Sequence, residues 1–477
     1  MEHSRGNWGS NIGFLLASIG SAVGLGNIWG FPFKMGKYGG FTFLLVYIIL
    51  AVFVGFIIMV SELAIGRMTG KGAVGAYYEV SKKFKWIGWL AVLAPFLIMA
   101  FYTVLSGYCM EYAALNLANL SFGLSSGSGG ELFGRMLNQP FGAALATVVF
   151  ILICYFIVKG GIKDGIEKFN KVGMPALFVM LVIIIIRSLT LPGAAEGLKF
   201  MFVPGYSVEA GFFEEAPSFL ATLANAGGQM FFSLSLAMGV MVTYGSYLSK
   251  KENMVKNSLV IVIADTIVAL MAGLAVIPAA IARHGTDAQL SGPSLLYITL
   301  QDVFAEMGPI GPLFGVIFYL LVIIAAISSV ISLIEVVTTF FMDRSMIKHN
   351  KPGNRSKITM WICLAVIAEA LVVAIDGLGS NGLWVPFQSL GISGWNDCWL
   401  DFIDCISEGF LMPIGALLMS IMIGWEMKPK KIITEIEQGY SGRIKGFYSF
   451  CIKFVCPLVM VLILLGQIDT FFKLNWF

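Results

Sequence analysis

The chain reads Gly20-Ser21-Ala22-Val23-Gly24-Leu25-Gly26-Asn27 in the middle of its first long apolar segment. Each glycine lowers the stability of a helix by about 1 kcal/mol relative to alanine, and it allows backbone conformations that other residues avoid. A similar run, Asn225-Ala226-Gly227-Gly228-Gln229 and then Phe231-Phe232-Ser233-Leu234-Ser235, lies in the sixth apolar segment. Close helix packing also favours small residues. Paired interruptions five segments apart, however, indicate two inverted repeats with a binding site where their broken helices meet.

The composition around these two segments is that of a membrane protein. Of 477 residues, 58% are hydrophobic and 12% are charged, whereas soluble domains carry about 25% charged residues. The mean hydropathy is +0.85. These values exclude a soluble multidomain enzyme and a disordered chain. The net charge of +3 gives no reason to expect a nucleic-acid partner.

Eleven apolar segments are long enough to cross a bilayer as helices. They cover about residues 11–37, 41–67, 88–119, 140–158, 165–190, 217–248, 256–282, 309–342, 358–376, 400–425 and 447–469. They do not alternate apolar and polar residues as the strands of a barrel do. We therefore expect an all-α polytopic membrane protein forming one transmembrane domain over residues 1–477. Repeat one covers about 8–190, repeat two covers about 210–425, and 447–469 forms an extra helix.

The distribution of basic residues predicts the orientation of the chain. With the N-terminus in the cytoplasm, only seven of the 31 lysines and arginines face outward. They are Lys34, Lys37, Arg135, Arg187, Lys199, Arg283 and Lys473. Basic residues concentrate on the cytoplasmic side of membrane proteins. We expect a multi-pass protein of the plasma membrane, with a cytoplasmic N-terminal tail, no signal peptide and an extracellular C-terminus.

Other chemistry has no clear residues in this sequence. The three histidines are far apart, and no CxxC or HExxH spacing occurs among the seven cysteines. No nucleophile and base stand in a recognisable pairing. Cys398 and Cys405, at the start of the tenth segment, would lie too far apart on a helix for a disulfide. We do not expect an enzyme.

Several motifs make the chain similar to a known family. They are Gly20–Asn27 with Phe31-Pro32 and Gly39-Gly40, Glu62–Arg67, Lys159–Asn170, Gly228–Ser235 and Tyr244–Tyr247. Together they resemble the neurotransmitter:sodium symporter family, and most of all its bacterial amino-acid transporters, over about residues 5–465. The family is usually drawn with twelve spans, whereas eleven are expected here.

The resemblance implies a sodium-coupled symporter of neutral, hydrophobic L-amino acids that works by alternating access and contacts membrane lipid. One alternative is a proton-coupled carrier of the same fold, with Asp265 or Glu335 as the titrating group. Another is a membrane receptor that binds an amino acid without transporting it. The specific amino acid, the coupling ratio and the oligomeric state stay open.

Two sodium sites are implied by the resemblance. The first consists of Ala22, Asn27, Ser233 and a residue of the seventh segment, with the substrate carboxylate. The alignment leaves Ala264 or Asp265 for that residue, and we expect Asp265 because Ala264 has no side-chain oxygen. A carboxylate in mid-membrane costs at least about 2.5 kcal/mol and so usually has a role. The alternative is an Asp that is simply hydrogen-bonded to a neighbouring helix. The second site consists of Gly20, Val23, Ala325, Ser328 and Ser329, although two serines can also bond back to their own helix.

The negative charge of Asp265 affects whether transport needs chloride. Some relatives bind chloride where this chain has Ala269, which has no hydroxyl. We expect Asp265 to supply that charge instead, so that transport is independent of chloride.

The resemblance also places the substrate. Its contacts are Ala22, Gly24, Leu25, Gly26, Ile98, Tyr102, Phe232, Ser235, Met238, Ser329, Ser332 and Leu333. Monoamine carriers have an acidic residue where this chain has Gly24, so glycine indicates a substrate that brings its own carboxylate. The apolar pocket contains Met238, which can repack around different side chains.

Gates are expected on both sides of this site. The inner gate consists of Arg5, Trp8, Tyr247, Asp343 and Glu335, with Asp343 as the ion-pair partner of Arg5. Tyr102 and Phe232 form the outer lid. The family's outer arginine is replaced by Gly30, which leaves Asp401 and Asp404 as acids without it. Lys34 could reach them, although lysine lacks the planar fork of arginine. Glu62 is expected to support the broken sixth helix.

Overall fold

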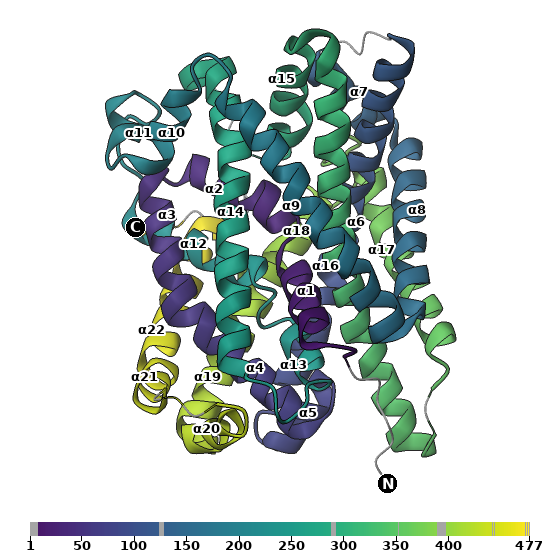
Figure 1. Ribbon diagram of the computed structural model, residues 1–477, viewed down its shortest axis with the longest axis vertical. Helices are drawn as coiled ribbons and strands as arrows, with labels where there is room; N and C mark the ends of the chain where they lie inside the picture. The colour runs from purple at the N-terminus through teal and green to yellow at the C-terminus, as the bar shows by residue number, and fades with distance from the viewer. Residues whose placement is uncertain are drawn as a thin grey trace.

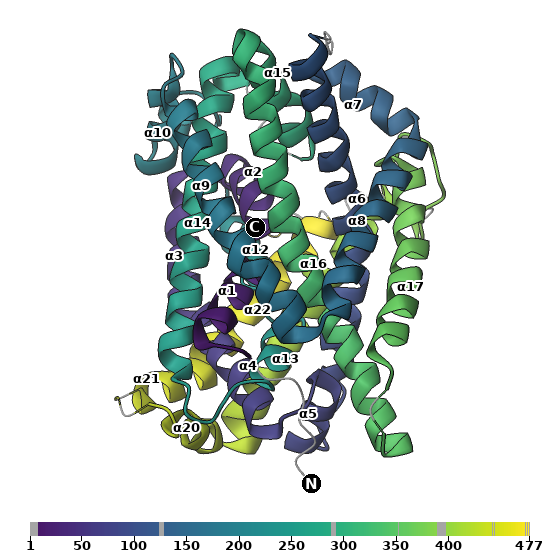
Figure 2. The ribbon, with the colours of Figure 1, turned by 45° about the vertical axis from the view of Figure 1, so that its right-hand side comes forward.

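The computed structural model describes residues 8–123, 128–287, 292–351, 353–388, 397–440, 442, 444–472, 474 and 476. Within these residues the regular elements are all helices, and Figures 1 and 2 show the long ones standing side by side in one bundle. This agrees with the predicted all-α membrane fold.

Nine helices of the described residues are long and apolar enough to cross a membrane. They are Phe41–Thr69 (containing α3 and α4), Ile87–Phe122 (α6), Pro140–Lys159 (α8), Ile162–Leu189 (containing α9), Met254–His284 (α14), Gly308–His349 (containing α16), Arg355–Asp376 (α17), Trp399–Met427 (containing α18 and α19) and Lys445–Asp469 (containing α21 and most of α22). Within these spans α3 is Phe41–Leu50, α4 is Phe56–Thr69 and α16 is Gly311–His349. Each coincides with a predicted segment. Two predicted segments, the first and the sixth, are absent from this set because both are broken.

The first span is divided between two helices. α1 (Asn11–Ala22) and the helical run Gly26–Lys37, which ends in α2 (Phe31–Lys37), meet at an angle of 46°. The Ser10 side chain caps the start of α1 by accepting the Gly13 N–H. The chain therefore changes direction between Val23 and Leu25, inside the quoted glycine-rich stretch.

The sixth span is also divided, at the end of the quoted run and not at its glycines. α12 (Phe219–Ser233) continues through Gly227 and Gly228, and α13 (Val240–Gly245) begins after an irregular segment. Backbone φ is positive at Ser235 and Ala237, inside that segment, and at Gly239 at its end. The Asn225–Gln229 run is thus helical. Its Gly227 makes room for α22 (Cys456–Phe472), because a Cβ there would lie 2.2 Å from Ile463 Cδ1.

Shorter helices cover the two ends of the bundle. They are α5 (Ala73–Val80), α7 (Gly129–Asn138), α10 (Ala194–Phe202), α11 (Tyr206–Glu209), α15 (Leu300–Glu306) and α20 (Pro429–Glu437). Figure 1 shows α7, α10 and α15 towards the upper end, and α5 and α20 at the lower end.

Glycine contacts hold α13 against the Phe41–Thr69 span. A Cβ on Gly66 would lie 2.0 Å from the Val242 carbonyl oxygen, and one on Gly245 would lie 2.5 Å from the Leu63 carbonyl oxygen. Backbone cannot move aside as a flexible side chain can. The lower half of the broken sixth span is therefore held by direct backbone contact.

We predict that Gly66→Ala destabilises the protein by about 1–3 kcal/mol, because it forces α4 and α13 apart. The measurement is the thermal unfolding midpoint of the purified protein in detergent. Gly134→Ala is the matched control, since Gly134 also lies in a helix but has open space around it. Equal midpoints for the two variants would contradict the prediction.

Candidate functional site

A cavity enclosing about 270 Å³ lies where the two broken helices face each other. It is lined by Ser21, Ala22, Gly24, Gly26, Ile98, Tyr102, Phe232, Ser235, Met238, Ser329 and Leu333. These residues come from the first span, α6, α16 and the irregular segment with the end of α12 that precedes it. Ten of the twelve predicted substrate contacts line it. The other two, Leu25 and Ser332, are hydrogen-bonded to its walls.

The walls of this cavity carry backbone groups that the broken helices release. The Leu25 N–H donates to the Tyr102 hydroxyl at 2.7 Å. The Ser21 carbonyl accepts hydrogen bonds from Ser235 Oγ at 2.9 Å and Ser329 Oγ at 3.1 Å. Ser21 was not among the predicted contacts, although it lies inside the quoted stretch. The cavity thus offers both donors and acceptors that no regular helix would expose.

Gly24 lies close to two side chains of the cavity wall. A Cβ at this position would lie 2.2 Å from the Tyr102 hydroxyl oxygen and 2.3 Å from Ser329 Oγ. No larger residue fits without moving both side chains.

A buried carboxylate, that of Asp265, connects the two breaks. Asn27 Nδ2 donates to its Oδ1 at 2.8 Å, Ser233 Oγ lies 3.0 Å from both oxygens, and Tyr47 OH donates to Oδ2 at 3.1 Å. Among the described residues, no basic side chain pairs with it. Asp265 is fully buried and Ala264 is not, so the structure brings Asp265 to the predicted site. Tyr47 was missed, because nothing in its own segment points to this partner.

A second cluster of oxygens joins α1 to α16. Ser328 Oγ lies 3.5 Å from the Val23 carbonyl oxygen and 2.7 Å from that of Ala325. Ser329 Oγ lies 3.3 Å from the Ala325 carbonyl oxygen. The serines thus bond back to their own helix and also face the break in the first span. Val23, Ala325, Ser328 and Ser329 are thus brought together. Gly20 lies on α1, three residues before Val23, and its missing side chain leaves room for Asn170.

Glu62 holds the irregular segment of the sixth span. Its Oε1 accepts the Ala237 N–H at 2.8 Å, at a residue whose φ is +59°. Glu62 is buried. This is the position expected of a residue that supports the break.

Trp8, α13, the segment after it, α16 and α17 meet through aromatic rings and an ion pair. Trp8 Nε1 donates to the Tyr244 carbonyl at 3.2 Å, and the Trp8 ring meets those of Tyr244 and Tyr247 edge-on. Tyr247 OH donates to Glu335 Oε1 at 2.9 Å, and the Arg355 guanidinium binds both oxygens of that carboxylate.

The predicted inner gate compares with the structure at three residues. Arg355 was not predicted, since it reads as one of many basic residues in a loop. Asp343 accepts the Gly72 N–H at 2.9 Å. Arg5 lies outside the described residues, so the expected Arg5–Asp343 pair stays a prediction.

On the predicted outer side of the cavity, the partner of Lys34 differs from the prediction. Tyr102 and Phe232, the predicted lid, lie with ring centroids 6.1 Å apart. Lys34 forms its ion pair with Glu408, however, rather than with Asp401 or Asp404. Glu408 lies one helical turn after Asp404 on the same span, and at that position it meets Lys34. At Gly30 the space is taken by Gln229, which would lie 2.8 Å from a Cβ there and donates to the Gly26 carbonyl.

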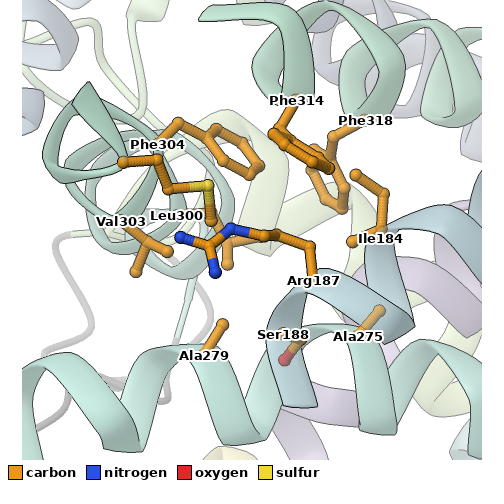
Figure 3. A pocket seen from close by; sticks show the side chains of 11 residues that line it. Ile184, Arg187, Ser188, Ala275, Ala279, Leu300, Val303, Phe304, Phe314 and Phe318 are labelled. Carbon is orange, nitrogen blue, oxygen red and sulfur yellow. The ribbon is translucent and has the colours of Figure 1, made fainter. Parts of the chain in front are cut away.

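A separate cavity lies among α9 (Lys168–Leu189), α14, α15 and α16. Figure 3 shows the Arg187 side chain extending into it among apolar neighbours. Arg187 Nε and Ser188 Oγ are buried there without a hydrogen-bond partner. With about 10 Å³ open to a water-sized sphere, it has room for about one water molecule. It is not a candidate substrate site.

Comparison with known proteins identifies the family. The sequence profile described as "Sodium:neurotransmitter symporter family" matches residues 5–124 and 135–476. The chain belongs to this family.

Individual relatives agree over the full length of this symporter. YhdH of Bacillus subtilis, described as a sodium-dependent transporter, is 32% identical over 471 residues, or 98% of each chain. A sodium-dependent transporter of Methanocaldococcus jannaschii is 28% identical over 96% of this chain and 89% of its own. The crystal structure of MhsT in complex with L-phenylalanine matches with a TM-score of 0.85 and 31% identity, covering 97% of this chain and 100% of that one. The protein is a sodium-coupled membrane transporter of a small molecule, not an enzyme.

We predict that Arg355→Ala lowers the unfolding free energy of this symporter by about 3 kcal/mol, because it leaves the buried Glu335 carboxylate without its cation. Thermal unfolding in detergent measures the effect. Adding Glu335→Gln to the same chain should recover most of the loss, since it removes the unpaired charge. No recovery in the double variant would show that the ion pair is not the source of the effect.

Proposed function

We propose that this symporter carries neutral, hydrophobic L-amino acids together with sodium, using two sodium sites and no chloride. The observation that carries the proposal is Gly24, packed against Tyr102 and Ser329 with no space for an acidic side chain. The site therefore has no carboxylate of its own beside the substrate, which must bring one. The L-phenylalanine in the MhsT complex supports an amino acid.

The chemistry of the cavity assigns each end of the amino acid a place. Its carboxylate is bound by the Tyr102 hydroxyl and the N–H groups of Leu25 and Gly26, at the start of a helical run where anions are favoured. Its amine is bound by carbonyls at the breaks, those of Ala22 and Phe232, with Ser21 added by the structure.

The substrate side chain lies in the apolar part of the cavity. Ile98, Met238 and Leu333 line it there. The cavity leaves only about 20 Å³ open to a water-sized sphere, little more than one water molecule needs. The pocket must widen to admit an amino acid. Met238 is the flexible residue that can repack, and Ser332 and Ser235 lie beside it as polar neighbours.

The first sodium ion binds at Asp265. Carboxylate, amide, hydroxyl and carbonyl oxygens from Asp265, Asn27, Ser233 and Ala22 are ligands that suit a hard cation, and the substrate carboxylate completes them. The Asp265 charge takes the place of chloride, which relatives bind at the position of Ala269. The second ion binds between the first span and α16, at Gly20, Val23, Ala325, Ser328 and Ser329.

Alternating access then opens one side of the cavity at a time. On the cytoplasmic side the gate consists of Arg5, Trp8, Tyr247, Asp343 and Glu335, to which the structure adds Arg355. On the outside it consists of Tyr102 and Phe232, with Asp404 near the Lys34–Glu408 pair. The N-terminus is cytoplasmic and the C-terminus extracellular, in the plasma membrane.

The two alternatives have less support. Asp265 accepts hydrogen bonds from three side chains, and Glu335 pairs with Arg355. Glu335 is thus already paired, and the oxygens around Asp265 form the kind of ligand set that a hard cation takes, which supports sodium coupling over proton coupling. A receptor would bind the amino acid equally well, so transport itself must be measured.

Uptake by proteoliposomes separates the three functions. We predict that an inward sodium gradient without a pH gradient drives accumulation of a hydrophobic amino acid such as L-phenylalanine, and that a pH gradient alone does not. A panel of the standard amino acids, used as competitors, then identifies the substrate. Accumulation driven by pH alone would indicate the proton carrier, and sodium-dependent binding without accumulation would indicate the receptor.

Replacing chloride by gluconate should leave this uptake unchanged, because Asp265 supplies the negative charge. We predict that Asp265→Asn reduces sodium-driven uptake at least about tenfold, a loss of about 1.4 kcal/mol or more in coupled binding. Asp164→Asn, at an exposed position, is the control. A large loss of wild-type uptake in gluconate would contradict the assignment of this charge.

A further inference from the structure

A groove lined by four lysines lies at the lower end of the bundle in Figure 1, where the Trp399–Met427 span, α20 and the start of the last span meet. About 560 Å³ of the groove is open to a water-sized sphere, and the groove shares no residue with the central cavity. The lysines are Lys428, Lys430, Lys445 and Lys453, and Thr434 and Ser449 add two hydroxyls.

The groove has a large excess of positive charge. Its one carboxylate, Glu437, forms an ion pair with Lys445 at 2.7 Å. Within the described part of the chain, the other three lysines form no ion pair. The start of α20 also lies here, at Lys428 and Pro429, and no side chain caps it. The N-terminus of a helix favours an anion, so helix and lysines act together.

The backbone at Lys428, in the wall of the groove, has an unusual conformation. Its φ is +64° and its ψ is 134°, a conformation that glycine adopts readily and other residues adopt at a cost. Strained residues of this kind concentrate where a side chain must be held for a function. Lys428, with this backbone conformation, is one of the residues that line the groove.

The groove opens beside the apolar surface of the bundle. Trp425 is 62% exposed and Phe454 is 53% exposed, and their rings lie 6.1 Å apart. Aromatic residues at the end of a span are typical of the boundary between lipid headgroups and acyl chains. A basic groove beside exposed aromatic rings is the arrangement expected for an anionic lipid headgroup.

We propose that this groove binds the phosphate of an anionic phospholipid, with its acyl chains beside Trp425 and Phe454. Basic pockets at the cytoplasmic ends of spans recognise such headgroups. Only the leaflet depends on the function proposed above: with a cytoplasmic N-terminus, the lipid belongs to the inner leaflet.

The opposite face of α20 connects the groove to the broken sixth span. Glu435 accepts from Arg67 Nε at 2.8 Å and pairs with Lys250 at 3.2 Å. Arg67 also donates to the Glu252 carbonyl at 2.8 Å. A lipid that holds α20 therefore stabilises α4 and the segment that follows α13, which belong to the inner side of the transporter.

Native mass spectrometry of the purified full chain tests the proposal. The probes are phosphatidylglycerol and phosphatidylcholine with the same acyl chains. Each lysine near a phosphate contributes about fivefold to binding, so the first phosphatidylglycerol should bind at least about tenfold more tightly than phosphatidylcholine. Lys430→Gln with Lys453→Gln should abolish this preference, and phosphatidylglycerol should raise the thermal midpoint of the wild type but not of this variant.

Two comparisons exclude general electrostatics and misfolding. Lys348→Gln with Lys351→Gln, an equal charge change at the end of α16, should keep the preference. Lys428→Gly should weaken phosphatidylglycerol binding while raising stability, because glycine relieves the strained backbone. Equal loss in the Lys348/Lys351 variant, or no preference in the wild type, would overturn the proposal. So would glycerol phosphate or inorganic phosphate displacing the lipid at millimolar concentration. None of these measurements requires transport, so a failure of symport leaves them interpretable.

Discussion

The carboxylate of Asp265 has hydrogen bonds from three helices and, in the described part of the chain, no basic partner, and it lies between the two interrupted spans. Donors from Asn27, Ser233 and Tyr47 satisfy its oxygens but do not neutralise its charge. A buried charge without a counter-ion costs several kcal/mol. In the function proposed above, a sodium ion at this point would remove that cost, and it would do so only while the first and sixth spans are both in place. Ion binding and the arrangement of the breaks are therefore parts of one equilibrium.

Close contact between backbone segments makes this arrangement possible. Gly24 lets the first span approach Tyr102 and Ser329, and Gly66 lets α4 approach α13. Glu62 then binds the strained Ala237, so that the irregular segment is held by a charged acceptor instead of by helix geometry. The lower gate is held in the same manner, by the buried pair of Glu335 and Arg355. Glycines let the backbone segments come close together, and the buried carboxylates of Glu62 and Glu335 hold them there through hydrogen bonds.

Much of this could be predicted from the sequence, because the site residues lie in short motifs whose polar and small residues stand out in apolar segments. Asp265 is such a case. The exact break in the sixth span could not be predicted: Gly227 and Gly228 look like an interruption, yet they stay helical and pack against α22. The real break has positive φ at Ser235, the last residue of the quoted run, and at Ala237 beyond it. Tyr47, Gln229, Arg355 and Glu408 were also missed, because their roles depend on which helix face meets which neighbour.

Counting bound sodium tests the central claim most directly. Purified protein saturated with its amino acid should bind two radioactive sodium ions per chain. Asp265→Asn should bind one, since the cluster at Ser328 and Ser329 does not contain this carboxylate. An unchanged count in the variant, or no sodium bound by the wild type, would contradict the claim that the buried Asp265 carboxylate is completed by sodium.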